Sequence, residues 1–345
     1  MDNHHGARPT LSAAEGSPTL DLVATPLTLR ASDQAGGPTY RLGLDRWAHW
    51  ALVANLVTQV AIVVTGGLVR LTGSGLGCPT WPQCVPGSYT PVVQQPQGVH
   101  SVIEFGNRTL TGVVGIVALA ALVAVALDVW RRGRPRRLVV LAAVPLVGVA
   151  VQAVLGGITV LTHLSPATVA AHFLVSALIV AASTVLLSRA QADDGPARLV
   201  VRAEVQWLAW ALAALTALIL VLGTVVTGSG PHSGDADAPA RFGFDPRSVS
   251  WLHADAVLVW FGVLLAVLVA LRLSAGPALA RRRAVVVLGV GLAQGLIGYL
   301  QYFTGLPVVA VALHLLGACL LVVAVTRLVL ATHDRSPSNN PHLHH

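Results

Sequence analysis

The sequence contains no lysine and few charges of either sign. Charged residues make up 11% of the 345-residue chain and hydrophobic residues 54%, whereas a soluble domain usually carries about 25% charged residues. This scarcity of charge excludes an ordinary soluble domain. Apolar runs of about 20 residues recur along the chain, each long enough to cross a bilayer. Because buried amides in a bilayer must be satisfied within their own segment, the sequence predicts an all-α polytopic membrane protein.

The absence of lysine means that the formal net charge of +7 comes from arginine alone. These arginines flank the apolar runs, so we predict a membrane protein with no nucleic-acid partner. One set of flanks is much richer in arginine than the other, and the rich set is expected to be cytoplasmic. It holds Arg41, Arg46, Arg131, Arg132, Arg134, Arg136, Arg137, Arg189, Arg198, Arg202, Arg272, Arg281, Arg282, Arg283, Arg327 and Arg335. We therefore expect a multi-pass protein of the cell (plasma) membrane, with both termini cytoplasmic and no cleavable signal peptide.

Eight spans are predicted from the apolar runs. They lie at about 47–69, 107–129, 138–160, 167–188, 205–226, 251–272, 284–304 and 308–330. The predicted organisation is a disordered cytoplasmic N-terminus over 1–44, a first four-helix half over 45–190 with an outward cysteine loop at 70–106, a cytoplasmic linker over 191–204, a second half over 205–330 and a disordered cytoplasmic tail over 331–345.

The chain repeats itself at an offset of 142 residues. The segment from Gln152 to His172 matches the segment from Gln294 to His314 at both of these residue types and at several positions between them. The tetrapeptide Thr-Gly-Ser-Gly also closes the first span of each half, at 72–75 and 227–230. We therefore predict two tandem four-helix bundles related by pseudo-two-fold symmetry, with the axis normal to the membrane because each copy has an even number of spans.

Three histidines, His172, His253 and His314, fall in the outer halves of predicted spans, and the equivalent point of the second span is Asn107. Ionisable residues within a bilayer are functional candidates by default. Two imidazoles from one bundle suit the axial positions of haem iron, which makes His253 and His314 the predicted pair. Hydrogen-bonded packing is the alternative for each histidine alone, and zinc lacks a completing carboxylate or thiolate cluster. Gly317, on the face of His314, could let a flat macrocycle approach the backbone.

The outward flanks hold few arginines, and each is a candidate partner for a haem propionate or else scattered loop charge. They are Arg70, Arg108, Arg241 and Arg247. Glu104 lies three residues before Asn107, on the same helical face. A partly buried carboxylate there could exchange protons during an oxidation. The alternative is a helix-start acid favoured by the macrodipole.

Cysteine is scarce, with three residues in the whole chain. Cys78 and Cys84 share the outward loop, where an oxidising compartment would permit a disulfide. The pair is either a structural staple or a thiol pair that exchanges electrons with an external reductase. Cys319 lies in the last apolar run and is expected to be a small buried residue.

Together these features resemble the haem A synthase family, and its actinobacterial branch in particular. The resemblance is carried by eight spans in two repeats, by the loop GGLVRLTGSGLGCPTWPQC, by the segment IEFGNRTLTG that begins the second span, and by the histidines at the outer ends of spans 4, 6 and 8. It covers about residues 45–330.

The resemblance implies an oxidoreductase that acts on a CH3 group. Such an enzyme oxidises the C8 methyl of haem O to a formyl group by successive hydroxylations, giving haem A for aa3-type cytochrome c oxidase. The family would place a haem b cofactor on His253 and His314 and substrate haem O near Glu104 and His172, and it would give the Cys78–Cys84 disulfide a redox role. Implied partners are haem O, membrane lipid, haem O synthase and cytochrome c oxidase assembly factors, with a homo-oligomer left open.

One departure from the family pattern concerns the first half. Many members carry Glu-x-x-His where this chain runs from Glu104 to Asn107. Substrate iron would then be held by His172 alone, with one face open, unless His100 or His163 substitutes. Two alternative functions use the same residues differently. A b-type electron-transfer cytochrome needs the histidines but not Glu104, whereas a haem transporter would form no formyl product.

Overall fold

The computed structural model describes residues 46–232, 234–235 and 239–336. The predicted disordered N-terminus over 1–44 lies outside these residues, as does the end of the predicted tail, 337–345. In the described part of the chain, eight helices are long and apolar enough to cross a membrane. They are α1 (Arg46–Leu71), α2 (Val99–Arg132), α3 (Arg137–Leu161), α4 (Pro166–Gln191), α5 (Ala203–Ser229), α6 (Pro246–Leu273), α7 (Ala278–Phe303) and α8 (Val308–Leu330). The eight predicted spans are confirmed.

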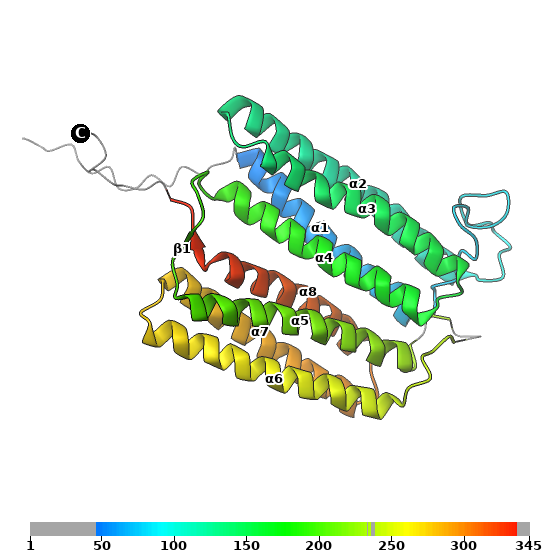
Figure 1. Cartoon of the computed structure of the whole chain (residues 1–345). Helices are drawn as coiled ribbons and strands as arrows, with labels where there is room; N and C mark the ends of the chain where they lie inside the picture. The colour runs from blue at the N-terminus through cyan, green and yellow to red at the C-terminus, as the bar shows by residue number, and fades with distance from the viewer. Residues whose placement is uncertain (1–45, 233, 236–238, 337–345) are drawn as a thin grey trace, which may run out of the picture. The chain divides into compact units, whose positions relative to one another are not determined.

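The helices form two four-helix bundles, α1–α4 and α5–α8 (Figure 1). In the first bundle each helix packs on two neighbours, α1 on α2 and α4, and α3 on α2 and α4, and the second bundle has the same arrangement. Between the bundles, α8 packs on α1 and α4, and α4 packs on α5. Exchanging α1 with α5 and α4 with α8 leaves this set of contacts unchanged. The packing therefore has the pseudo-two-fold relation that the repeat predicts.

Each bundle has a packed core at one end only. The first core includes Leu52, Ala124, Val180 and Leu186, and the second includes Leu212, Leu264, Val287 and Leu328. Every one of these residues lies in the half of its helix nearer the arginine-rich connections. In the opposite half, which the arginine distribution predicts to be the outer one, the stretches 60–68, 165–176, 220–227 and 311–317 contain no buried residue among those described. The outer half of each bundle is thus loosely packed, and this is where the histidines lie.

Short contacts link the two halves at both ends of the helices. At the arginine-rich end, β1 (Arg198–Leu199) pairs antiparallel with β2 (His333–Asp334). This pairing extends ordered structure past residue 331, where a disordered tail is predicted from composition, because the linker offers that segment a strand partner. At the outer end, the N–H of Gly75 donates to the carbonyl of Gly234 at 3.0 Å.

Three helices, α2, α6 and α7, begin clearly earlier than hydropathy predicts, and α7 starts at Ala278 rather than near 284. The α2 helix starts at Val99 rather than near 107, so Glu104, Asn107 and Arg108 lie inside the helix instead of at its start. The α6 helix starts at Pro246 rather than near 251, because Asp245 caps it by accepting hydrogen bonds from the hydroxyl and the N–H of Ser248. These bonds keep the pKa of the Asp245 carboxyl below its usual value.

Candidate functional site: the outer ends of the even-numbered helices

Each of the three membrane histidines lies against a glycine of the preceding helix. A methyl group added at the glycine would be in ordinary van der Waals contact with the Cε1 atom of the imidazole, so each ring lies directly over its glycine. The pairs and these distances are Gly156 with His172 at 3.4 Å, Gly223 with His253 at 3.4 Å and Gly298 with His314 at 3.5 Å. Three separate helix pairs, α3–α4, α5–α6 and α7–α8, therefore present an imidazole in the same way.

The fourth helix pair has the same geometry with a different side chain. Asn107 of α2 lies opposite Gly66 of α1, where an added methyl group would be 3.8 Å from its Nδ2 atom. Its Oδ1 accepts a 2.9 Å hydrogen bond from the Thr65 hydroxyl. Asn107 thus occupies the position of a fourth histidine. Of the two predicted substitutes, His100 bonds through Nδ1 to the Ser74 hydroxyl at 2.8 Å, and His163 is exposed in the turn after α3.

Glutamines at equivalent repeat positions fix the backbone beside two of the histidines. The Nε2 of Gln152 donates to the carbonyl of His172 at 2.8 Å, and that of Gln294 donates to the carbonyl of His314 at 3.0 Å. The Gln294 side chain also fills the space next to Gly317. The prediction that Gly317 leaves room for a flat macrocycle is therefore wrong, because a neighbouring side chain already uses that room.

The imidazoles are left with unused ring nitrogens. The Nδ1 atoms of His172, His253 and His314 are buried and have no hydrogen-bond partner. His253, near the start of α6, and His314, near the start of α8, lie at the same end of the second bundle. Within the described residues, no three His, Cys, Asp or Glu side chains gather as a metal-ion cluster. The second half therefore offers a pair of imidazoles rather than a tetrahedral ligand set.

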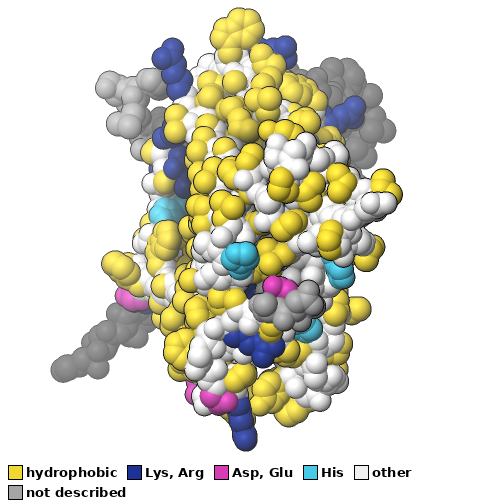
Figure 2. Space-filling model, turned by 90° about the vertical axis from the view of Figure 1, so that its right-hand side faces the viewer, with side chains coloured by type: hydrophobic (Ala, Val, Ile, Leu, Met, Phe, Trp, Pro, Cys, Tyr) yellow, Lys and Arg dark blue, Asp and Glu magenta, His cyan; other side chains and the backbone are white. Residues whose placement is uncertain are grey.

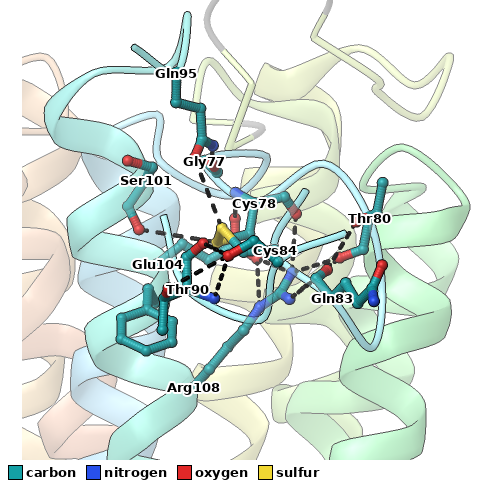
Figure 3. Close-up of a disulfide and its surroundings, with 12 residues drawn as sticks. Gly77, Cys78, Thr80, Gln83, Cys84, Thr90, Gln95, Ser101, Glu104 and Arg108 are labelled. Carbon is teal, nitrogen blue, oxygen red and sulfur yellow. Dashed lines mark hydrogen bonds and ion pairs between the residues drawn. A yellow bond between two sulfur atoms is a disulfide. The ribbon is translucent and has the colours of Figure 1, made fainter. Parts of the chain in front are cut away.

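A second group of functional residues gathers at the start of α2. Glu104 is buried, and its Oε2 accepts a 2.7 Å hydrogen bond from the N–H of Cys78 (Figure 3). The Arg108 guanidinium pairs with the other carboxylate oxygen at 2.6 Å and donates to the carbonyls of Cys78 and Thr80 at 2.9 and 3.1 Å. One ion pair on α2 thus holds the beginning of the cysteine loop through its backbone.

The cysteine loop is closed by a disulfide and is packed against two helices. Cys78 and Cys84 are bonded to each other, and neither side chain is exposed. Gly77 approaches the backbone of His100 so closely that any side chain would collide with it. On α3, the ring of Trp81 packs on Gly157, next to the glycine that faces His172. The loop therefore lies over the outer end of the first half. Cys319, by contrast, is a buried free cysteine, as predicted.

The four outward arginines have different environments. Arg108 is committed to the cysteine loop. Arg70 joins the halves, since its Nη2 donates to the carbonyl of Thr227 at 3.1 Å while its Nε is buried without a partner. Arg241 and Arg247 are exposed near the start of α6. Figure 2 shows arginine and histidine side chains together on this end of the molecule.

Sequence reasoning overlooked the glycines that face the histidines. Gly156 and Gly298 coincide in the repeat, so their importance could have been read from it. Gly66 and Gly223 fall outside the 142-residue offset, and only the packing of α1 on α2 and α5 on α6 reveals them. The Glu104–Arg108 pair was also missed, although its spacing of four residues is the signal of an ion pair along a helix.

Fold and site define a class: duplicated four-helix membrane proteins that carry imidazoles on α4, α6 and α8, at the end opposite the arginine-rich connections. A family model described as cytochrome oxidase assembly protein, COX15-CtaA, matches residues 48–233. The chain belongs to this family.

Curated relatives agree with this assignment. The chain is 35% identical over 150 residues to a protein named heme A synthase from Lysinibacillus sphaericus, covering 42% of this chain and 45% of the relative. It is 33% identical over 138 residues to a protein of the same name from Bacillus licheniformis, covering 39% and 42%. For one from Alkalihalophilus pseudofirmus the identity is 30% over 148 residues, covering 41% and 47%. The match thus spans less than half the length of these relatives. The family match also ends before His253 and His314.

Proposed function

We propose that the protein is a haem A synthase, which oxidises the C8 methyl of haem O to a formyl group by successive hydroxylations and so makes haem A for an aa3-type cytochrome c oxidase. The conversion of methyl to formyl adds one oxygen and removes two hydrogens overall. Family membership and the names of the curated relatives support this activity. The observation that carries it is a recurring arrangement at the loosely packed end of each bundle, in which an imidazole faces a glycine in three helix pairs and Asn107 faces a glycine in the fourth.

The residues of the second half fit a haem b cofactor. His253 on α6 and His314 on α8 come from helices that each pack on α5 and α7 rather than on each other, and the packed core stops short of both histidines. Their Nδ1 atoms lie on the side of Gly223 and Gly298, which leaves Nε2 as the nitrogen that could bind iron. We infer that these two imidazoles would hold the haem b iron. Bound there, the group would supply one-electron transfer. The chain itself holds the backbone of His314 through Gln294 and places the two rings against Gly223 and Gly298.

The residues of the first half fit a substrate haem rather than a permanent one. His172 offers an imidazole, whereas the opposite position is an amide held by Thr65. An amide is a weak iron ligand, so substrate iron would be held on one side and left open on the other. The cysteine loop, packed on α3 beside His172, would limit the access of water to this end. Arg70, at the seam of the two halves, is the arginine best placed for a propionate, because its Nε still has no partner.

Glu104 is proposed as the proton-accepting group of the reaction. Among the described residues, Glu104 and Asp128 are the buried acids, and only Glu104 lies at the outer end of its helix. With water as the oxygen source and an external electron acceptor, each hydroxylation of the methyl group releases two protons and two electrons, and a carboxylate within reach can accept the protons. Its contacts with Arg108 and the N–H of Cys78 would hold it in position and tie its charge to the cysteine loop.

The decisive experiment is co-expression with a haem O synthase, followed by an optical spectrum of the purified protein and extraction of its pigments. Wild type should yield haem A and a low-spin b-type signal. His253→Ala and His314→Ala should each remove the b-type signal, and the matched control His163→Ala, an exposed loop histidine, should retain both. Glu104→Ala should spare the b-type signal and remove haem A. Unchanged haem O with a normal b-type signal from the wild type would contradict the synthase and leave an electron-transfer cytochrome.

The location and partners follow from the same proposal. The arginine-rich ends of the helices would face the cytoplasm, which places both termini there and the haem sites toward the outside of the cell membrane. Substrate haem O would come from a membrane-bound synthase, and the product would pass to oxidase assembly factors. Whether copies of the chain associate is open to measurement by mass in detergent.

A further inference from the structure

A pocket of about 200 Å³ lies at the arginine-rich end of the first bundle, far along the helices from the histidines. Three of its lining residues are arginines from three separate segments: Arg137 begins α3, Arg189 lies in the last turn of α4, and Arg335 follows β2. The volume equals that of roughly six or seven water molecules, which is room for a compact charged group.

Arg335, which follows β2, reaches the pocket because the segment after α8 runs beside the first bundle. Pairing of β2 with β1 brings the residues after α8 beside the linker that follows α4. The Nη1 of Arg335 then donates to the carbonyl of Gly195 at 3.0 Å, while its Nε is buried without any acceptor. A guanidinium is thus fixed at the pocket with a donor still unused.

The pocket holds more positive charge than the protein neutralises. Arg189 lies close enough to Arg137 and Arg335 for their charges to repel. Two acids line the same pocket, but Asp194 already pairs with Arg134 at 3.0 Å. Asp193 is then the remaining carboxylate against three guanidiniums. Like charges held this close are unfavourable unless an anion lies between them.

The remaining walls indicate which anion would fit. Leu138, Leu141 and Val185 line the pocket on the sides of α3 and α4, helices long and apolar enough to lie in the bilayer. A free anion gains nothing from such walls, whereas a phospholipid would place its phosphate among the arginines and its acyl chains along the helices. Basic pockets between spans on the cytoplasmic side suit anionic headgroups, and guanidinium forks suit phosphate oxygens.

We propose that this pocket binds the phosphate of an anionic phospholipid and thereby fastens the end of the second half beneath the first. The site is independent of the haem chemistry, since none of its residues lies near the histidines or the cysteine loop.

The test uses the full-length protein, delipidated in an uncharged detergent, with lipid binding followed by native mass spectrometry. The probes are phosphatidylglycerol, phosphatidylcholine and inorganic phosphate. The pocket variant is Arg189→Gln/Arg335→Gln, and the matched control is Arg131→Gln/Arg136→Gln, which removes the same charge from exposed positions outside the pocket. Wild type and control should bind phosphatidylglycerol alike and prefer it to phosphatidylcholine, while the pocket variant should bind it at least about 10-fold more weakly.

Equal phosphatidylglycerol affinity in the pocket variant and the control would overturn the proposal. Saturation of the wild type by inorganic phosphate in place of lipid would overturn the lipid assignment in favour of a soluble phosphate. If the glutamine variant does not fold, Arg189→Lys/Arg335→Lys replaces it. That variant keeps the charge but loses the planar fork, so its affinity should fall several-fold, and an unchanged affinity would count against the site.

Discussion

The backbone N–H of Cys78 donates a 2.7 Å hydrogen bond to the buried carboxylate of Glu104. The disulfide-closed loop is therefore held directly by an acidic side chain of α2. Arg108 strengthens this link, because it contacts both Glu104 and the carbonyl of Cys78. Whatever changes the loop changes the surroundings of the carboxylate. Changes to the disulfide or to Arg108 should therefore affect both the activity and the stability of the protein.

Opening the disulfide should loosen the loop and release Glu104 from its position. Cys78→Ser/Cys84→Ser removes a cross-link that closes a short loop. Such a cross-link contributes about 2 kcal/mol to the free energy of unfolding. We expect haem A formation to fall at least about 10-fold while the b-type signal of the second half stays intact, as measured by pigment extraction and optical spectroscopy. Cys319→Ser, a change at the buried free cysteine of α8, is the control for loss of a thiol. Full activity in the double variant would show that the disulfide is not required for haem A formation.

Removing the partner of Glu104 should destabilise the protein. In Arg108→Ala a buried carboxylate loses its ion pair, and the carbonyls of Cys78 and Thr80 lose a donor. Breaking such a pair costs about 2–4 kcal/mol, which should appear as a clear drop in the temperature of unfolding in detergent. Arg247→Ala, at an exposed arginine, should change stability by less than about 0.5 kcal/mol. Similar unfolding temperatures for the two variants would mean that the pair is energetically unimportant.

The glycines facing the histidines can be tested on a single helix. Gly298→Leu would drive a side chain into the ring of His314, whereas Gly295, one turn earlier on α7, has open space around it. We expect Gly298→Leu to abolish the low-spin b-type signal and Gly295→Leu to retain it, because only the first change displaces an imidazole. Optical spectra of the two purified proteins decide the matter. A normal spectrum from Gly298→Leu would show that the glycine has no part in placing the ring.

Installing the missing histidine should change the first half. In Asn107→His an imidazole would face Gly66, so both halves would then present a pair of histidines. The expected result is an additional low-spin signal, with haem O held more tightly through washing of the protein in detergent. Asn107→Gln keeps an amide and should show neither effect. If the histidine variant has the spectrum of the wild type, Asn107 does not face the iron of the substrate.

The sequence predicted the features that depend on local pattern. Eight spans follow from apolar runs, and the repeat follows from residues such as Gln152 and Gln294, whose hydrogen bonds to the following helices are the same in both halves. The histidines were identifiable because imidazole is rare in a bilayer. The structure of the loop over residues 72–98 was harder to predict from the sequence. It depends on the close approach of Gly77 to the backbone of His100 and on the packing of the Trp81 ring against Gly157.

Contacts between distant segments could not be predicted from the sequence. Arg70 donates a hydrogen bond to Thr227, which lies 157 positions away in the sequence, and Arg335 donates one to Gly195, which lies 140 positions away. No periodic pattern in the sequence indicates either contact. The start of α2 was misplaced because residues 99–106 are too polar for a hydropathy window, although Ser101 and Glu104 share the face that packs on the loop.

Placing both packed cores at the arginine-rich ends separates the side chains that stabilise the bundles from the side chains proposed for the chemistry. Leu186 and Leu264 lie in those cores, away from the histidines. A substitution at a histidine should therefore leave the core of its bundle in place, so that a variant without activity is still a folded membrane protein.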